Sequence, residues 1–483
     1  MQFTLVETRL GLLNSTTRLP FRYGKACLTR CPQVVLRATI DVGGRRQAGY
    51  SGDCLPPGWF DKSPTKDYRL QIAEMLDVIA LSEQVFLDHG KQPQEFFSVW
   101  RQASHEVHQQ AQERQYESLL ASFGVSLVER ALMDALCRAH GCGFATAVRE
   151  NLFRLVPGEI YPELASVELA QALPAVPLTS VYVRHTTGLA DPLTTADIPP
   201  EERLNDGFPQ SLEEYLQQDG VRYLKIKVCG DLNHDIQRLS TIKDLLQRQW
   251  GDSYQLTLDG NEQYASADQF QALIEALLSR PELDGLLRNT IAIEQPLERS
   301  IALEEAHTEG IRQLSKSKPV IIDESDGTID AYSRAIELGY RGISSKNCKG
   351  PTKSLINAAL TWWHNQSHEA PHYLMTGEDL CSVGVVPVQA DLCLAATIGL
   401  DHVERNGHHY HRGLSYLPEP EQQAALETHA DFYAAQHGIV SPRIVDGRFE
   451  IGSFHGVGFG FGVEPDMDAR QSADEWDFDS LGV

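Results

Sequence analysis

The sequence has no apolar run that approaches the roughly 20 consecutive apolar residues of a membrane-spanning helix. Its first residues, M-Q-F-T-L-V-E-T-R-L-G, carry a charge within each short apolar stretch and lack the apolar centre of a secretory signal peptide. We therefore expect a cytoplasmic protein with no membrane partner.

Positive charge is also scarce. The chain has 42 Lys and Arg against 66 Asp and Glu, which gives a formal net charge of -24. This balance argues against a nucleic-acid partner and against an anionic membrane surface. An anionic substrate would need local lysines or a metal ion to hold it.

Cysteine is sparse and lacks the spacing of a metal or disulfide framework. The nine cysteines form no C-x-x-C motif, and the closest pairs in sequence are Cys27 with Cys31 and Cys137 with Cys142. These spacings predict reduced and mostly buried thiols.

A length of 483 residues fits two domains. Residues 1–160 have strand-like and then helix-like patterns, which predicts an α+β domain with Gly- and Pro-containing loops at 19–32 and 49–60. The clearest helix is predicted over 127–140, with Ser126 and Glu129 as its capping box and Gly141 at its end.

From about residue 178, short apolar strands alternate with amphipathic helices. One strand and one helix repeat at intervals of roughly 25–35 residues, as in parallel βαβ units. Eight such strands predict an α/β fold, a closed (β/α) barrel of the TIM type over residues 161–435. Residues 436–483 return to strand-like sequence before an acidic tail, and we expect this segment to complete the N-terminal capping domain.

The second predicted strand, V-R-Y-L-K-I-K-V, carries two lysines on one face. Side chains alternate along a strand, so Lys225 and Lys227 point the same way while Leu224 and Ile226 point the other. Neighbouring ammonium groups lower each other's pKa, which makes a lysine of this pair a candidate general base. Taken alone, the pattern also fits an edge strand with two solvated lysines.

The ends of the next strands carry acidic residues. They read L-T-L-D-G-N, A-I-E-Q-P and V-I-I-D-E-S, followed by I-S-S-K-N. In a parallel barrel these ends meet at one rim. Carboxylates from three adjacent strands repel unless a cation lies among them, which predicts Mg²⁺ or Mn²⁺ at Asp259, Glu294 and Asp323. We prefer Asp323 to Glu324 by strand alternation; singly, each carboxylate also fits a helix cap or a surface residue.

These motifs resemble the enolase superfamily, in its muconate-lactonizing-enzyme-like branch (the mandelate racemase/muconate lactonizing enzyme family). The matching segments are K-I-K, D-G-N, E-Q-P, D-E-S and S-S-K-N. The resemblance implies that Lys227 and Lys346 flank the α-carbon of a carboxylate substrate, with Lys225 assisting the enolate. It also implies that the metal binds the substrate carboxylate.

Further residues are candidates for substrate contact. Asn261 belongs to D-G-N, and Glu378 and Glu404 end the seventh and eighth strands, where a structural role is an equal alternative. The 20s and 50s loops resemble the family's specificity loops, which implies Tyr23, Lys25 and Trp59 in the pocket.

Two segments depart from the family pattern. The sequence N-C-K-G-P follows Lys346 where the family has a glycine pair, and N-G-H-H-Y-H-R-G follows the eighth strand. We expect His408, His409 and His411 of the second segment to lie in a surface loop, with substrate contact as the alternative.

The sequence therefore predicts an isomerase or lyase that abstracts the α-proton of a small-molecule carboxylate with Mg²⁺. Racemisation, epimerisation, elimination or cycloisomerisation would follow. The alternatives are an acid-sugar dehydratase of the same superfamily and a non-catalytic binding protein that keeps the barrel. We also expect a homo-oligomer.

Overall fold

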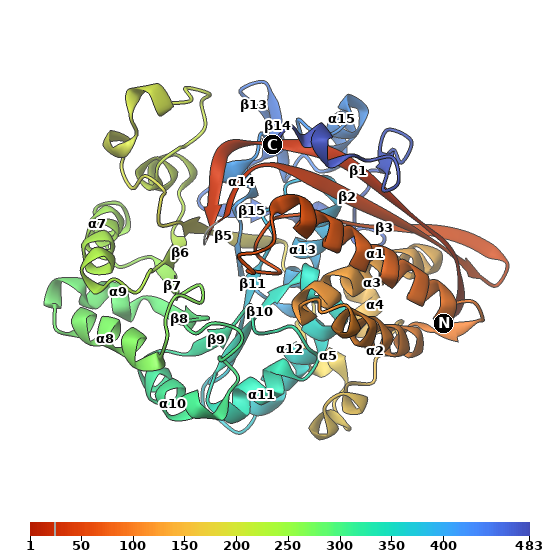
Figure 1. Ribbon diagram of the computed structural model, residues 1–483, viewed down its shortest axis with the longest axis horizontal. Helices are drawn as coiled ribbons and strands as arrows, with labels where there is room; N and C mark the ends of the chain where they lie inside the picture. The colour runs from red at the N-terminus through yellow and green to blue at the C-terminus, as the bar shows by residue number, and fades with distance from the viewer. Residues whose placement is uncertain (24–25) are drawn as a thin grey trace.

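The computed structural model describes residues 1–23 and 26–483, with the side chains of residues 23 and 26 excepted. Figure 1 shows a barrel of strands and outer helices, with the N-terminal strands and helices lying across one of its ends. The α/β barrel with an α+β cap, predicted from the sequence, is confirmed.

The cap is an antiparallel sheet covered by helices. Its strand order is β16-β1-β2-β3, and β4 pairs with the start of β1. The C-terminal segment supplies β16, so both ends of the chain build this sheet. The cap strands are β1 (Gln2–Tyr23), β2 (Ala26–Val42), β3 (Arg45–Cys54), β4 (Gln94–Glu95) and β16 (Gln471–Ser472). The cap helices are α1 (Tyr68–His89), α2 (Phe96–Glu113), α3 (Ser118–His140) and α4 (Phe144–Arg149).

The loop predicted at 19–32 is strand at 19–23 and 26–32, so that prediction is wrong, whereas the loop predicted at 49–60 is confirmed from Leu55 onward. Strand β1 runs to Tyr23, β2 begins at Ala26 and β3 runs to Cys54. The ladder between β1 and β2 is irregular between Thr16 and Phe21, and Pro20 lies in this interval, where no ladder hydrogen bond requires its nitrogen. The proline therefore interrupts the pairing without ending the strand.

Helix α3 begins nine residues before the predicted start, at Ser118 rather than 127. Ser126 lies inside it and donates to the Phe123 carbonyl, so the predicted capping box is wrong. The helix is buried from Leu119 to Cys137, and a helix buried on all sides has no amphipathic pattern to mark its start. Its end is confirmed, because Gly141 has a φ of 74° in the left-handed region.

Eight parallel strands form the barrel in the order β5 to β12, and pairing of β12 with β5 closes it. Strand β15 pairs antiparallel with β5 on its outer side. The strands are β5 (Ser180–Thr187), β6 (Tyr223–Lys227), β7 (Gln255–Asp259), β8 (Thr290–Glu294), β9 (Val320–Ile322), β10 (Gly342–Lys346), β11 (Leu374–Glu378), β12 (His402–Glu404) and β15 (Arg448–Glu450).

Helices follow most barrel strands and pack outside them. Leu224 and Ile226 of β6 are buried against this layer, whereas Lys225 points inward. The helices are α5 (Leu169–Ala172), α6 (Leu212–Glu214), α7 (Leu232–Trp250), α8 (Ala267–Leu278), α9 (Asp284–Arg288), α10 (Thr308–Ser317), α11 (Ala331–Leu338), α12 (Pro351–Asn365), α13 (Val385–Ile398), α14 (Gly407–Tyr410) and α15 (Glu419–Thr428). A hairpin of β13 (Tyr433–Gln436) and β14 (Ile439–Pro442) precedes β15.

Among the described residues, none of the helices combines the length and the apolar character needed to cross a membrane. All nine cysteines are free and six of them are buried, as the sequence predicted.

Close packing of β3 on α3 fixes the cap and predicts a severe substitution. A Cβ added at Gly49 would lie 2.2 Å from the Ala135 nitrogen and 2.3 Å from the Ala131 oxygen, both backbone atoms that cannot yield. We expect Gly49→Ala to lower the free energy of unfolding by about 3 kcal/mol, measured by urea denaturation.

The matched control is Gly285→Ala in α9, where the nearest atom to an added Cβ is 3.4 Å away. An alanine in this helix leaves stability unchanged or raises it by up to about 1 kcal/mol. Equal denaturation midpoints for Gly49→Ala and wild type would contradict the close packing.

Candidate active site

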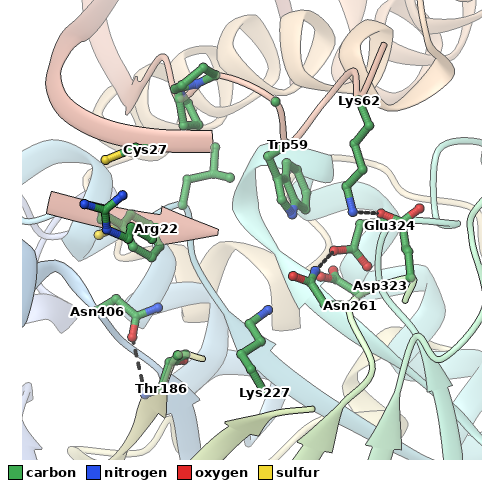
Figure 2. A pocket seen from close by; sticks show the side chains of 18 of the residues that line it. Arg22, Cys27, Trp59, Lys62, Thr186, Lys227, Asn261, Asp323, Glu324 and Asn406 are labelled. Carbon is green, nitrogen blue, oxygen red and sulfur yellow. Dashed lines mark hydrogen bonds and ion pairs between the residues drawn. The ribbon is translucent and has the colours of Figure 1, made fainter. Parts of the chain in front are cut away.

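A cavity of about 650 Å³ lies between the cap and the carboxyl ends of the barrel strands. In Figure 2, Trp59 and Lys62 approach it from the cap, whereas Lys227 and Asn261 approach it from the barrel. The volume is that of a typical small-molecule site.

Lys225 lies at the centre of a carboxylate cluster. Its Nζ is 2.6 Å from Glu294 Oε1, 2.7 Å from Glu378 Oε2 and 2.9 Å from Glu404 Oε2. Asp259 Oδ2 lies 3.2 Å from the same nitrogen. Burial lowers the pKa of Lys225, but these carboxylates outweigh burial and raise the pKa well above its ordinary value. Lys225 is therefore a fixed positive charge and not a proton acceptor.

Lys227 points into the cavity from the end of β6, and its Nζ is 2.6 Å from Asp259 Oδ2. Burial lowers the pKa of Lys227, as does the charge of Lys225, but the nearby carboxylates, Asp259 first among them, together raise the pKa above its ordinary value. The sequence predicted a lowered pKa for Lys227, and this prediction is wrong. The two-lysine pattern carries no information about the contact with Asp259 on the next strand.

Lys346 faces the cavity from β10. Its Nζ is 2.7 Å from Asp323 Oδ2, 3.4 Å from Glu378 Oε2 and 4.4 Å from the centre of the Trp59 ring. Since β6 and β10 are the second and sixth of eight strands, Lys227 and Lys346 approach the cavity from opposite sides of the barrel.

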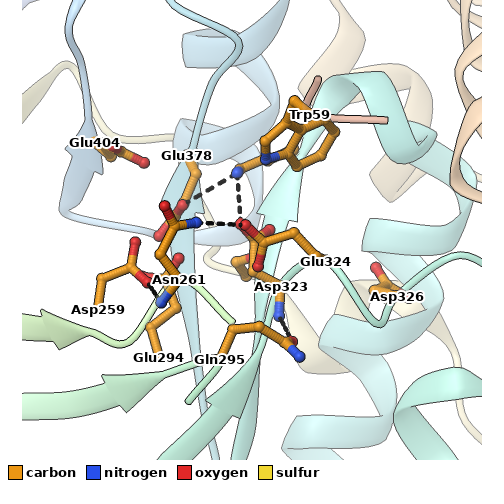
Figure 3. Close-up of polar contacts among 12 residues, drawn as sticks. Trp59, Asp259, Asn261, Glu294, Gln295, Asp323, Glu324, Asp326, Glu378 and Glu404 are labelled. Carbon is orange, nitrogen blue, oxygen red and sulfur yellow. Dashed lines mark hydrogen bonds and ion pairs between the residues drawn. The ribbon is translucent and has the colours of Figure 1, made fainter. Parts of the chain in front are cut away.

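Three buried carboxylates form a group that can hold a metal ion. One oxygen each of Glu294, Asp323 and Glu378 lies within 4.8 Å of the others. Figure 3 shows this group between β8, β9 and β11. Asp259, the third ligand predicted from the sequence, lies outside it, with one oxygen on Lys227 and the other accepting from the Asn261 N–H at 2.7 Å.

Unpaired charge at this group fits a divalent cation. Glu294 Oε2 is buried and has no hydrogen-bond partner. Burial and the carboxylates of Asp259 and Glu378 raise the pKa of Glu294 well above its ordinary value. A carboxylate with an unused oxygen among other carboxylates is the donor set that Mg²⁺ or Mn²⁺ uses.

Lys349 is a site residue that the sequence reasoning did not assign a role. Its Nζ donates to Asp323 Oδ1 and to Ser344 Oγ, both at 2.9 Å, behind the cavity wall. With Lys346 on Oδ2, both oxygens of Asp323 contact an ammonium group. The N-C-K-G-P segment is the part of the sequence that could have indicated this residue, because it places a lysine where the family has glycine.

Strand alternation argued against Glu324 as a metal ligand. In the structure Glu324 lines the cavity. Asn261 Nδ2 donates to its Oε1 at 3.0 Å. Burial, followed by the carboxylates of Asp323 and Glu262, raises the pKa of Glu324 to about 7.

The remaining predicted contacts divide into two groups. Glu404, Asn261 and Trp59 line the cavity. Glu378 instead joins Arg184 to Lys225, through Oε1 at 2.6 Å and Oε2 at 2.7 Å. Lys25 lies outside the described residues, as does the side chain of Tyr23.

The predicted surface loop around the histidines is wrong. Residues Gly407–Tyr410 form α14, and His409 and His411 are 3% and 4% exposed. His409 Nδ1 lies 2.8 Å from the Tyr215 hydroxyl, and His408 Nε2 lies 3.2 Å from His185 Nδ1. The segments before β6 cover these histidines, which the local sequence does not reveal. Of the N-G-H-H-Y-H-R-G segment, Asn406 and Tyr410 line the cavity.

The fold is a (β/α) barrel with an α+β cap, and comparisons with solved structures agree. No protein-family model matches the sequence. No curated protein sequence matches it either.

Three solved structures show the likeness in fold. N-succinyl Arg/Lys racemase from Bacillus cereus ATCC 14579 superposes with a TM-score of 0.59 at 14% identity, over 97% of this chain and 96% of the other. A dipeptide epimerase from Enterococcus faecalis V583, complexed with Mg and the dipeptide L-Leu-L-Tyr, has a TM-score of 0.58 at 14% identity, over 95% and 99%. The muconate lactonizing enzyme from Pseudomonas fluorescens, complexed with muconolactone, has a TM-score of 0.57 at 15% identity, over 96% and 97%. The chain therefore shares the fold of these mandelate racemase/muconate lactonizing enzyme-type structures, as the sequence predicted.

The carboxylate group predicts where substitution weakens cation binding. Glu294→Gln should lower the affinity for Mg²⁺ at least about 100-fold, measured by calorimetry and by loss of the Mg²⁺-induced rise in melting temperature. The reason is that its unpaired oxygen is the one carboxylate oxygen of the group not already paired with a lysine or arginine.

Two further variants decide the third ligand. Asp259→Asn weakens Mg²⁺ binding more than Glu378→Gln if the sequence-predicted set holds the ion, and the reverse ranking supports the group seen in the structure. Unchanged Mg²⁺ affinity in all three variants would contradict a cation site here.

Proposed function

We propose that this protein abstracts the α-proton of a small-molecule carboxylate and returns a proton to the opposite face, so that it racemises or epimerises its substrate. The observation that carries this proposal is the pair of lysines on β6 and β10, facing one cavity from opposite sides with buried carboxylates between them. The racemase and the epimerase among the structural neighbours support it.

Lys227 and Lys346 exchange the proton with the two faces of the α-carbon. In each direction one lysine accepts the proton as a neutral amine and the other donates as an ammonium group. Lys227 contacts Asp259 and Lys346 contacts Asp323, and both carboxylates were predicted from the sequence as cation ligands. A carboxylate that also binds a cation stabilises the lysine ammonium group less. Cation binding therefore lowers the pKa of the lysine and favours the neutral amine.

The cation site supplies charge stabilisation. A Mg²⁺ or Mn²⁺ ion held by Glu294 and Asp323, with Asp259 or Glu378, would bind the substrate carboxylate and offset the charge that develops on it. Lys225, permanently charged beside Glu294, adds a second positive charge on the barrel axis.

The chain offers less support for an acid-sugar dehydratase. That branch places a His-Asp pair on the sixth and seventh strands, whereas β10 and β11 end here in Lys346 and Glu378. A non-catalytic binding protein is also less well supported, since the cavity is open and both lysines reach it.

Proton exchange in D₂O tests the proposal. We expect the Mg²⁺-loaded protein to exchange the α-proton of one substrate class in a panel of N-acyl amino acids, dipeptides and sugar acids, followed by NMR. Lys227→Ala should lower exchange from one stereoisomer by about 10²–10⁴-fold and Lys346→Ala should do so for the other, since each base serves one face.

The control is Lys316→Ala, which removes an exposed lysine of α10 and should exchange like wild type. Full exchange of both stereoisomers by Lys227→Ala would contradict the assignment of the base. Absence of exchange with every compound of the panel would contradict the enzyme proposal.

A further inference from the structure

A second group of metal-binding side chains lies at the start of α7, outside the carboxylate cluster. Cys229 Sγ is 3.5 Å from His234 Nδ1 and 3.3 Å from Asp235 Oδ1, and the last two atoms are 3.9 Å apart. None of the three residues lines the active-site cavity. His234 borders a different cavity of about 820 Å³, formed with residues 189–204.

The three donor atoms have the spacing of a tetrahedral zinc site. Zinc binds sulfur at about 2.3 Å and nitrogen or oxygen at about 2.0–2.2 Å, so neighbouring tetrahedral ligands lie roughly 3.3–3.7 Å apart. The observed separations of 3.3, 3.5 and 3.9 Å fall on or close to this range. Side-chain exposures of 52% for His234 and 2% for Asp235 leave a fourth position open toward solvent.

Backbone groups hold this arrangement in place. The Asp235 carboxylate accepts from the backbone N–H groups of Cys229 and Gly230 at 3.0 Å. Asp231 caps α7 by accepting from the N–H of His234 at 3.0 Å. The first contacts orient the Asp235 carboxylate before an ion arrives, as the outer partners of known metal ligands do, and the second fixes the backbone that carries His234.

We propose that Cys229, His234 and Asp235 bind a borderline divalent cation of the Zn²⁺ or Co²⁺ type. Thiolate and imidazole donors select such ions over Mg²⁺, which takes oxygen ligands. Binding involves no redox change: the Cys229 thiol, which donates to Asp235 in the described structure, releases its proton to solvent, and the ion takes its place. The site does not depend on the proposed α-proton chemistry.

Cobalt absorption tests the site. The protein is saturated with Mg²⁺ to fill the carboxylate group and then titrated with Co²⁺. We expect thiolate-to-cobalt charge-transfer absorption that saturates at one equivalent and is displaced by Zn²⁺. The carboxylate cluster has no thiol donor, so this absorption reports the second site alone.

Variants assign the ligands. Cys229→Ser should abolish the absorption, whereas Cys142→Ser, a change at another partly exposed cysteine, should leave it intact. His234→Gln changes a half-exposed side chain, so it tests the site even if Cys229→Ser does not fold, and should weaken Co²⁺ at least about 10-fold. Absence of thiolate absorption in wild type, its persistence in Cys229→Ser, or unchanged affinity in His234→Gln would overturn the proposal.

Discussion

The ammonium group of Lys225 is the contact on which the arrangement of this barrel depends. It is 2% exposed and neutralises carboxylates from four other strands, β7, β8, β11 and β12. A buried charge without partners costs several kcal/mol, so each of these carboxylates requires the lysine and the lysine requires them. The ion pairs join strands that are far apart in sequence. They also fix where the ends of these side chains lie along the barrel axis.

Two carboxylates at the strand ends each contact two lysines, and this sharing has a chemical consequence. Lys227 shares Asp259 with Lys225, and Lys346 shares Asp323 with Lys349. Each base therefore competes with another cation for its carboxylate, so its proton affinity responds to whatever else that carboxylate binds. Within the group of Glu294, Asp323 and Glu378, Glu294 keeps a buried oxygen without a hydrogen-bond partner. The pKa of the bases and the binding of a divalent ion are thus linked through shared side chains.

The strands and the residues at their ends were predictable because both follow local rules. Alternation placed Lys225 and Lys227 on one face, and the repeat of strand and helix placed the acidic strand ends at one rim. What failed depended on contacts between distant segments. The start of α3 is hidden because the helix is buried on all sides, and the pKa of Lys227 is set by Asp259 on another strand. The cluster of Cys229, His234 and Asp235 is an exception, because it is local in sequence; it was missed since its single cysteine forms no paired motif.

The turn after β7 connects the cap to the active-site residues. Asn261 and Glu262 have φ values of 44° and 65°, a left-handed conformation that costs about 1 kcal/mol or more for each residue. In this conformation Asn261 donates to Glu324, while Glu262 accepts from Arg299 at 2.8 Å and contacts Lys62.

Arg299 in turn donates to the carbonyls of Trp59 and Phe60, both at 3.0 Å, which fixes the loop of the cap that places the Trp59 ring over Lys346. A ring face above an ammonium group favours its charged form. The position of this cap loop and the protonation of Lys346 are therefore linked through the partly buried Arg299, which the turn after β7 holds through Glu262.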